Sequence, residues 1–363
     1  MPTVEFEIAP GKYVGGKHPC FIIAEIGQNH QGNVELAKAL IQIAAVLKPA
    51  FFLIIVDCGV DCVKFQKTDL LSRFTAEVLK RPYEGEHVWG STYGEHRKYL
   101  ELAGEDFVEL KKFSTDLGLC FAASGMDKPS TDFLNSLGVP FFKIGSADTT
   151  NLPLLKHLCR YNKPLVISTG MTTEADVCKM YDEVSKESQQ IALLQCTSCY
   201  PTPPHNVNLN VMKAYKDLFP EAVIGYSGHE KGIGISLAAV ASGAKILERH
   251  ITLDHSYKGS DHKSSLEPQE LKNLVDGIRR IEKAMGSNKK EFQECEKPCF
   301  EKLGKTIVAS RFLESGTFLD EDAMDVKVSV KKGYDPINYY DLIGKQLKTE
   351  VEKDEAILSV HLA

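Results

Sequence analysis

The sequence predicts an α/β protein: an eight-stranded (β/α)8 TIM barrel followed by a small β-rich domain. Eight short apolar segments alternate with stretches whose apolar residues recur at helical spacing, a pattern typical of parallel strands covered by helices. Polar residues also follow the apolar part of each predicted strand. In a barrel these strand ends meet on one face, whereas the alternative, an open doubly wound sheet, would divide them at a switch point.

The elements follow in chain order. A strand at 4–8 and a partner near 13–14 form an N-terminal hairpin around a Gly-Pro turn. The barrel strands are expected at 20–27, 61–67, 119–127, 140–148, 164–171, 191–204, 223–230 and 244–250. The helices between them are expected at 33–48, 106–117, 130–137, 153–159, 174–185, 211–218 and 231–244. A long polar excursion at 68–94 follows the second strand.

The composition indicates an ordinary globular protein. Its 363 residues, 43% hydrophobic and 25% charged, suffice for a large core and a second small domain. A formal net charge of −6 without a basic stripe argues against nucleic-acid binding. The longest apolar run, Ala50–Val56, is shorter than the roughly 20 residues of a membrane span. Because the N-terminus also lacks the apolar core of a signal peptide, we expect no membrane partner.

The ten cysteines predict a reducing compartment. Their spacing is not that of a disulfide framework, so we expect free thiols and a cytoplasmic location. Cys196 and Cys199 form a C-x-x-C pair, but the prolines that follow prevent the helix that a redox pair needs. We therefore expect no redox or zinc role there.

Two histidines end successive strands. Residues 224–262 predict a strand, a small-residue helix and a second strand, which places His229 and His250 side by side at one edge. Two converging imidazoles with Glu248, Asp254 and Asp261 nearby in sequence suit a divalent metal ion. The alternative is that each histidine caps its strand and bonds a carbonyl.

Other polar side chains follow the remaining strands at equivalent positions. They are Glu25, Lys64, Gln66, Ser124, Lys143, Ser146, Ser168, Thr169, Gln195, Thr197, Ser227 and Glu248. Lysines and hydroxyls at strand ends can hold an anionic substrate even in a chain of negative net charge. The alternative is that they are solvated residues of the barrel rim.

A series of motifs runs in one order along almost the whole chain: IIAEIGQNHQG, DCVKFQK, FFKIGSADTTN, VISTGM, LLQCTSCYPTP, IGYSGHE, and LERHITLD followed by KGSDH. These motifs resemble the sialic acid synthase family, whose members condense phosphoenolpyruvate with an N-acetylmannosamine substrate. FFKIGSADTTN and KGSDH resemble the animal-type enzymes most. That resemblance implies N-acetylmannosamine 6-phosphate as the substrate and a 9-phosphorylated sialic acid as the product.

The resemblance also implies roles for individual residues. A divalent ion, Mg²⁺ or Mn²⁺, on His229 and His250 would polarise the sugar aldehyde that the enol carbon attacks. Phosphoenolpyruvate would be held by Lys64, Gln66, Ser124, Lys143, Ser146, Ser168 and Ser227. Glu25, Asp148 and Glu248 are the candidates for proton transfer, and Tyr200 and Asp261 match sugar contacts. Bacterial members have Glu at Asp148 and Asn at Ser198, and Tyr200 could instead pack over the barrel mouth.

From about Glu294 the sequence changes to short strands and turns, which resembles the antifreeze-like (SAF) domain of sialic acid synthases. We expect the barrel at 1–284, an extended linker at 285–298 and this domain at 299–363. In the family the domain reaches over the barrel of the partner in a homodimer and supplies an Arg to the sugar. That position matches Val328 here, with Lys331 and Lys332 just beyond it.

The segment Val46–Asp57 is extra relative to the family. Pro49 should end the preceding helix, and the apolar run after it resembles a strand, although a ninth barrel strand conflicts with the motif order. We expect the segment to pack on the outer helices or at a subunit contact on the bottom face, where helix-to-strand loops lie.

Two other functions stay open. One is the same type of reaction on unphosphorylated N-acetylmannosamine or on mannose 6-phosphate. The other is a non-catalytic sugar- or ice-binding protein. Lys64, Lys143, His229 and His250 argue against the second, because a chain that had lost catalysis would be expected to lose them.

Overall fold

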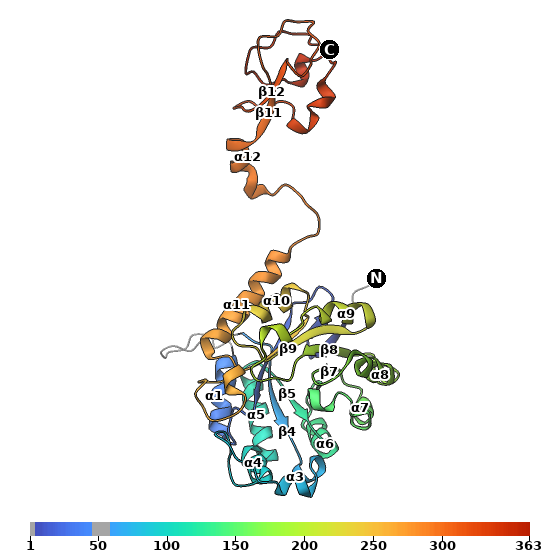
Figure 1. The fold of residues 1–363 in the computed structure, drawn as a ribbon, viewed down its shortest axis with the longest axis vertical. Coiled ribbons are helices and arrows are strands. Elements are labelled where there is room, and N and C mark those ends of the chain that lie inside the picture. The colour runs from blue at the N-terminus through green and yellow to red at the C-terminus, as the bar shows by residue number, and fades with distance from the viewer. Residues whose placement is uncertain (1–3, 46–58) are drawn as a thin grey trace. The chain divides into compact units, whose positions relative to one another are not determined.

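The computed structural model describes residues 4–45 and 59–363 (Figure 1). The chain forms two compact units, Met1–Gly286 and Ser287–Ala363. None of the helices in the described ranges combines the length and the apolarity that a membrane span requires.

The first unit contains a closed barrel of eight parallel strands, in the order β10-β3-β4-β5-β6-β7-β8-β9. The strands are β3 Phe21–Gly27, β4 Cys62–Lys67, β5 Cys120–Gly125, β6 Phe142–Ile144, β7 Leu165–Ser168, β8 Ile191–Cys196, β9 Val223–Gly228 and β10 Ile246–His250. Pairing of β10 with β3, from Ile246 opposite Phe21 to His250 opposite Glu25, closes the ring. The predicted barrel is confirmed, and the open sheet is wrong.

Helices surround the strands, as Figure 1 shows. They are α1 Val34–Ala44, α5 Gly104–Asp116, α6 Lys128–Leu137, α7 Leu152–Cys159, α8 Glu174–Val184, α9 Val211–Leu218, α10 Gly234–Ala241 and α11 Pro268–Met285. Local sequence explains several starts, because Asn33, Asp127 and Thr173 each accept a hydrogen bond from the first turn of a helix. Gly138, at φ +74°, ends α6 in the left-handed conformation that favours glycine.

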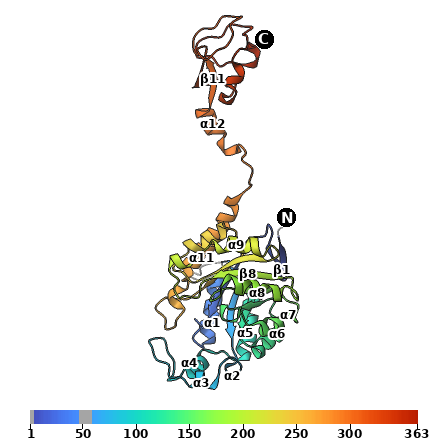
Figure 2. The same ribbon diagram turned by 45° about the vertical axis from the view of Figure 1, so that its right-hand side comes forward.

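The segment between β4 and α5, which begins with the polar excursion, contains three helices that the sequence analysis missed. They are α2 Leu70–Arg73, α3 Ala76–Lys80 and α4 Tyr93–Leu100. Segments this short carry no periodic apolar stripe, so capping residues are their only sequence signal: Asp69, Thr75 and Thr92 each accept a first-turn N–H. In Figure 2 these helices lie at the end of the barrel opposite the N-terminal strand β1.

The N-terminal hairpin closes the other end of the barrel. It pairs β1 Glu5–Ala9 with β2 Lys12–Gly15, as predicted. Phe6, Ile8 and Val14 of the hairpin join a buried cluster with side chains from the N-terminal parts of the barrel strands, among them Phe21 and Phe141. The bottom of the barrel interior is therefore a dry core.

Side chains alternate along each strand, and this alternation separates core from site. On β3, Ile22 and Ala24 pack in the outer cluster with the helices, while Ile23 packs inside and Glu25 follows it inside. The inner positions change from apolar to polar in the same way on other strands: Cys62 to Lys64, Ala122 to Ser124, Phe141 to Lys143, Val166 to Ser168, Val223 to Ser227 and Ile246 to Glu248. The upper half of the barrel interior is therefore polar.

The second unit is small and β-rich. It pairs β11 Lys305–Ala309 with β12 Met324–Val328 in antiparallel fashion around a core that includes Ile307, Leu319 and Leu347. The predicted extended linker at 285–298 is wrong at its ends, because α11 runs to Met285 and a 3-10 turn at Glu294–Glu296 leads into α12 Lys297–Leu303.

The expectation for Val46–Asp57 lies outside the described residues. The residues that flank it lie close together, since the Val60 N–H donates to the Ala44 carbonyl over 3.4 Å. Ala44, Ala45 and Val60 are all buried in the outer cluster. The helix end and the approach to the next strand are therefore fixed to each other directly.

Deleting Leu47–Val56 should leave the barrel and its activity almost unchanged. The direct contact of Ala44 with Val60 keeps the flanking elements in place, and closing a loop of this length costs only a few kcal/mol. Thermal unfolding should show a Tm within a few degrees of the intact chain, and steady-state assays should show kcat and KM within about twofold. A deletion variant that stayed folded but lost most of its kcat would contradict this expectation.

Candidate active site

A cavity of about 450 Å³ opens at the C-terminal ends of the barrel strands. Its lining includes fourteen residues that the family resemblance assigned to catalysis, substrate or metal: Glu25, Lys64, Gln66, Ser124, Lys143, Ser146, Asp148, Ser168, Tyr200, Ser227, His229, Glu248, His250 and Asp261. These residues come from all eight strands or the segments directly after them. The structure therefore brings these residues together in one cavity.

Some strand-end residues have structural roles instead. Thr169 and Thr197 donate to backbone carbonyls, of Leu194 and Asn206 respectively, and the Gln195 side chain donates to the Val207 carbonyl. None of the three lines the cavity. Asp254 also lies outside it and accepts from the Ser256 N–H instead, so its expected place beside the metal site is wrong.

Two lysines and two glutamates form a buried charge cluster at the base of the cavity. Lys64 Nζ lies 2.7 Å from Glu25 Oε2 and 3.8 Å from Glu248 Oε2. Lys143 Nζ lies 3.5 Å from Glu248 Oε1 and donates to Ser168 Oγ over 2.7 Å. All four side chains are at most 7% exposed. Charges buried this deeply are tolerated only when they are paired, so each glutamate offsets a lysine.

The two glutamates have opposite titration behaviour. Burial raises the pKa of Glu25 to about 7, against the opposing effect of Lys64. Burial acts in the same direction on Glu248, but Lys143 and Lys64 outweigh it and hold the pKa of Glu248 at about 2. Two carboxyl groups whose pKa values differ this much can take different roles. One can exchange a proton near neutral pH while the other stays ionised.

His229 and His250 lie together, with ring centroids 5.5 Å apart. His229 Nδ1 lies 2.9 Å from the Thr197 carbonyl, which can only accept, so Nδ1 carries the proton and Nε2 keeps its lone pair. His250 Nδ1 is buried without a hydrogen-bond partner, 3.9 Å from Asp261 Oδ2. The ring centroids of Tyr200 and His229 lie 4.0 Å apart. Tyr200 therefore packs against this histidine and also lines the cavity.

These two imidazoles fit a divalent ion. In His229 the bond from Nδ1 to a carbonyl leaves Nε2 free to bind an ion. In His250, which lines the same cavity, Nδ1 has no hydrogen-bond partner. Within the described ranges, no group of three or more His, Cys, Asp or Glu side chains is arranged to hold an ion. An ion on the histidines would therefore take its other ligands from substrate and water, as catalytic rather than structural ions do.

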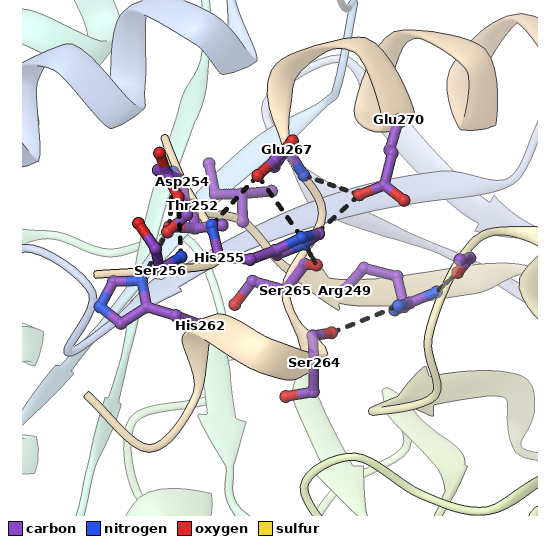
Figure 3. Close-up of polar contacts among 12 residues, drawn as sticks. Arg249, Thr252, Asp254, His255, Ser256, His262, Ser264, Ser265, Glu267 and Glu270 are labelled. Atoms are coloured by element: carbon purple, nitrogen blue, oxygen red, sulfur yellow. Dashed lines mark hydrogen bonds and ion pairs between the residues drawn. The ribbon is translucent and has the colours of Figure 1, made fainter. Parts of the chain in front are cut away.

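The loop after β10 positions Asp261. Figure 3 shows its internal contacts: His262 Nδ1 lies 2.7 Å from Thr252 Oγ1, and His255 Nε2 lies 2.8 Å from the Ser265 carbonyl. The Asp261 carbonyl also accepts from Ser265 Oγ over 2.7 Å. A loop held by its own polar contacts can present a carboxylate to a ligand with little loss of backbone entropy on binding.

The sequence analysis missed a group of residues on the cavity wall. Gln28, Arg73, Arg97, Met126 and Cys196 line it. Ser198, which the sequence analysis named as the counterpart of a bacterial Asn, lines it as well. Arg73 lies on the short helix α2 within the polar excursion, and Arg97 lies on α4, which extends beyond its end. The sequence signal that could have indicated these two arginines is the position of the excursion, which directly follows the strand that carries Lys64.

The chain resembles known proteins along nearly its whole length. A model of the NeuB family matches residues 53–290. N-acetylneuraminate-9-phosphate synthase of Homo sapiens is 48% identical over 99% of this chain and 96% of its own, and that of Drosophila melanogaster is 43% identical over 97% of each. The solved N-acetylneuraminic acid (sialic acid) synthetase of Leptospira borgpetersenii is 31% identical over 82% of this chain and 96% of its own, with a TM-score of 0.68. The chain therefore belongs to the NeuB family of sialic acid synthases.

Proposed function

We propose that the protein condenses phosphoenolpyruvate with N-acetylmannosamine 6-phosphate to give N-acetylneuraminate 9-phosphate and phosphate. The observation that carries this proposal is one cavity that combines a buried lysine pair with two adjacent histidines. Relatives that are 43% to 48% identical and named for this product support the choice of sugar.

The lysine pair is the proposed site for phosphoenolpyruvate. Lys64 and Lys143 place two ammonium groups at the base of the cavity. Lys64 donates a hydrogen bond to Ser124 Oγ, and Lys143 donates one to Ser168 Oγ. A phosphate or carboxylate there would gain charge-assisted hydrogen bonds from both lysines. Gln66, Ser146 and Ser227 line the same cavity and supply further donors.

The sugar is proposed to occupy the mouth of the cavity, beside Tyr200 and Asp261. His229 and His250 would hold the divalent ion, Mg²⁺ or Mn²⁺, which supplies Lewis-acid polarisation of a carbonyl when bound. These residues would orient the open-chain aldehyde toward the enol carbon. Holding the two reacting carbons at contact distance is itself a large part of catalysis.

The reaction balances with one water. The enol carbon forms a bond to the aldehyde carbon, whose oxygen takes up a proton, and a cation remains at carbon 2 of phosphoenolpyruvate. Water adds to that carbon and loses a proton, which leaves a hydroxyl group and the phosphate on the same carbon. The bond between this carbon and the phosphate oxygen then breaks, the hydroxyl gives its proton to the departing phosphate, and a ketone forms. Glu25, with a pKa raised to about 7, can exchange a proton at neutral pH, while ionised Glu248 can orient the water.

Other proposals rest on the family resemblance. They are a cytoplasmic homodimer, an antifreeze-like identity for residues 299–363, and a role for Lys331 or Lys332 near the sugar in place of the family's Arg. Free thiols agree with a reducing compartment, because each described cysteine is unpaired. Asp148 is half-buried near the mouth and bonds Asn151, so we assign it to sugar positioning or proton transfer there.

The product can be identified directly. Incubation with phosphoenolpyruvate, Mn²⁺ and N-acetylmannosamine 6-phosphate should yield N-acetylneuraminate 9-phosphate and one equivalent of phosphate, measured by mass spectrometry and phosphate release. Parallel reactions with N-acetylmannosamine and mannose 6-phosphate should be much slower. Faster turnover of either alternative sugar would replace the proposed substrate, and no product from any of them would refute the proposed activity.

Lys143→Met should raise the KM for phosphoenolpyruvate about 10- to 100-fold and leave the KM for the sugar nearly unchanged. The physical reason is the loss of charge-assisted hydrogen bonds worth about 1.5–3 kcal/mol. Lys156→Met is the matched control, because this lysine pairs with Glu183 on the outer helices, away from the cavity. A Lys143 variant whose sugar KM rose instead would place the sugar on the lysine pair.

A further inference from the structure

Two arginines reach the cavity from the polar excursion and the helix at its end. Arg73 ends α2 and Arg97 lies within α4, and both line the cavity together with Gln28. Arg97 is 8% exposed, and its Nη1 donates to Gln28 Oε1 over 2.8 Å. Its Nε and Nη2 are buried and have no hydrogen-bond partner. A buried guanidinium with unused donors is costly unless a ligand completes it.

Arg73 lies close enough to Arg97 to feel its charge. Burial and the Arg97 charge both lower the pKa of Arg73. Arg73 Nη1 contacts Thr68 Oγ1 at 3.3 Å and the Met126 sulfur, neither of which offsets a positive charge. Across the part of the chain that the structure describes, no carboxylate lies within ion-pair distance of either arginine.

This pair differs from the lysine pair deeper in the cavity. Glu25 and Glu248 offset Lys64 and Lys143, whereas the arginines have no such partners. Asp148 acts on Arg73 only from a longer distance, as a weaker opposing effect on its pKa. Two uncompensated guanidinium groups on one wall suit an external anion with two or more negative oxygen atoms.

We infer that Arg73 and Arg97 bind the 6-phosphate of the sugar substrate and thereby select the phosphorylated sugar. This inference rests on the proposed function. Phosphoenolpyruvate already has a cation site at the lysine pair, so the 6-phosphate is the second anion of the reaction. A phosphate matches the planar donor fork of arginine, including the unused Nε and Nη2 of Arg97. The structure thus offers an intrachain alternative to Lys331 and Lys332 for this group.

The test compares two sugars in the full-length enzyme. Arg97→Met and Arg73→Met should each lower kcat/KM for N-acetylmannosamine 6-phosphate at least 10-fold through KM. The KM for phosphoenolpyruvate and the low kcat/KM for N-acetylmannosamine should stay within about twofold, so the preference for the phosphorylated sugar falls. Arg97→Lys, which keeps the charge and loses the fork, should lie between the wild type and Arg97→Met.

Arg81→Met is the matched control. Arg81 belongs to the same excursion, is exposed and stacks over Tyr93, outside the cavity. It should leave both sugars unaffected. If the Tm shows that Arg97→Met does not fold, the preference of Arg73→Met for the phosphorylated sugar tests the inference instead.

An unchanged preference in folded Arg73 and Arg97 variants would overturn the inference, and so would a rise confined to the KM for phosphoenolpyruvate. Both results would leave the proposed function intact, because the wild-type enzyme would still form the product. Absence of product from either sugar in the wild type would overturn the proposed function, and the inference with it.

Discussion

The buried charge cluster of Lys64, Lys143, Glu25 and Glu248 is the interaction on which the site depends. Each lysine would be too costly to bury alone, and each glutamate would lose its charge without a lysine beside it. The closed parallel barrel brings residues from β3, β4, β6 and β10 to one point. The barrel thus sets the distances between the four charged side chains, and these distances in turn set their pKa values.

The same strands make the core and the site. Inner positions two residues apart change from apolar to polar, so Ile23 packs against the N-terminal hairpin while Glu25 faces the cavity. A shift of one residue in strand register would exchange the inner and outer sets. It would place Val63 and Phe65 in the cavity in place of Lys64. Packing of the apolar inner layer therefore also fixes the position of the reactive groups.

Much of this arrangement could be predicted from the sequence because the information is local. Apolar strands, helical periodicity and polar strand ends predict the barrel and most of its strand-end cavity residues, whereas Asp148 and Tyr200 were named only through the family resemblance. Arg73 and Arg97 could not be predicted in this way, since they lie on helices too short for a periodic signal and reach the cavity only through the tertiary fold. Gln195 shows the converse: it ends a strand, but its amide bonds a backbone carbonyl. Position alone does not distinguish a ligand from a structural partner.

One cavity is proposed to hold phosphoenolpyruvate on the lysine pair and a divalent ion on the histidine pair. A crystal structure of the enzyme with phosphoenolpyruvate and Mn²⁺ would locate both. We expect an anomalous manganese peak within coordination distance of His229 and His250, and the phosphate within hydrogen-bond distance of Lys64 or Lys143. Manganese bound elsewhere, or phosphoenolpyruvate held at the cavity mouth by Arg73 and Arg97, would contradict it.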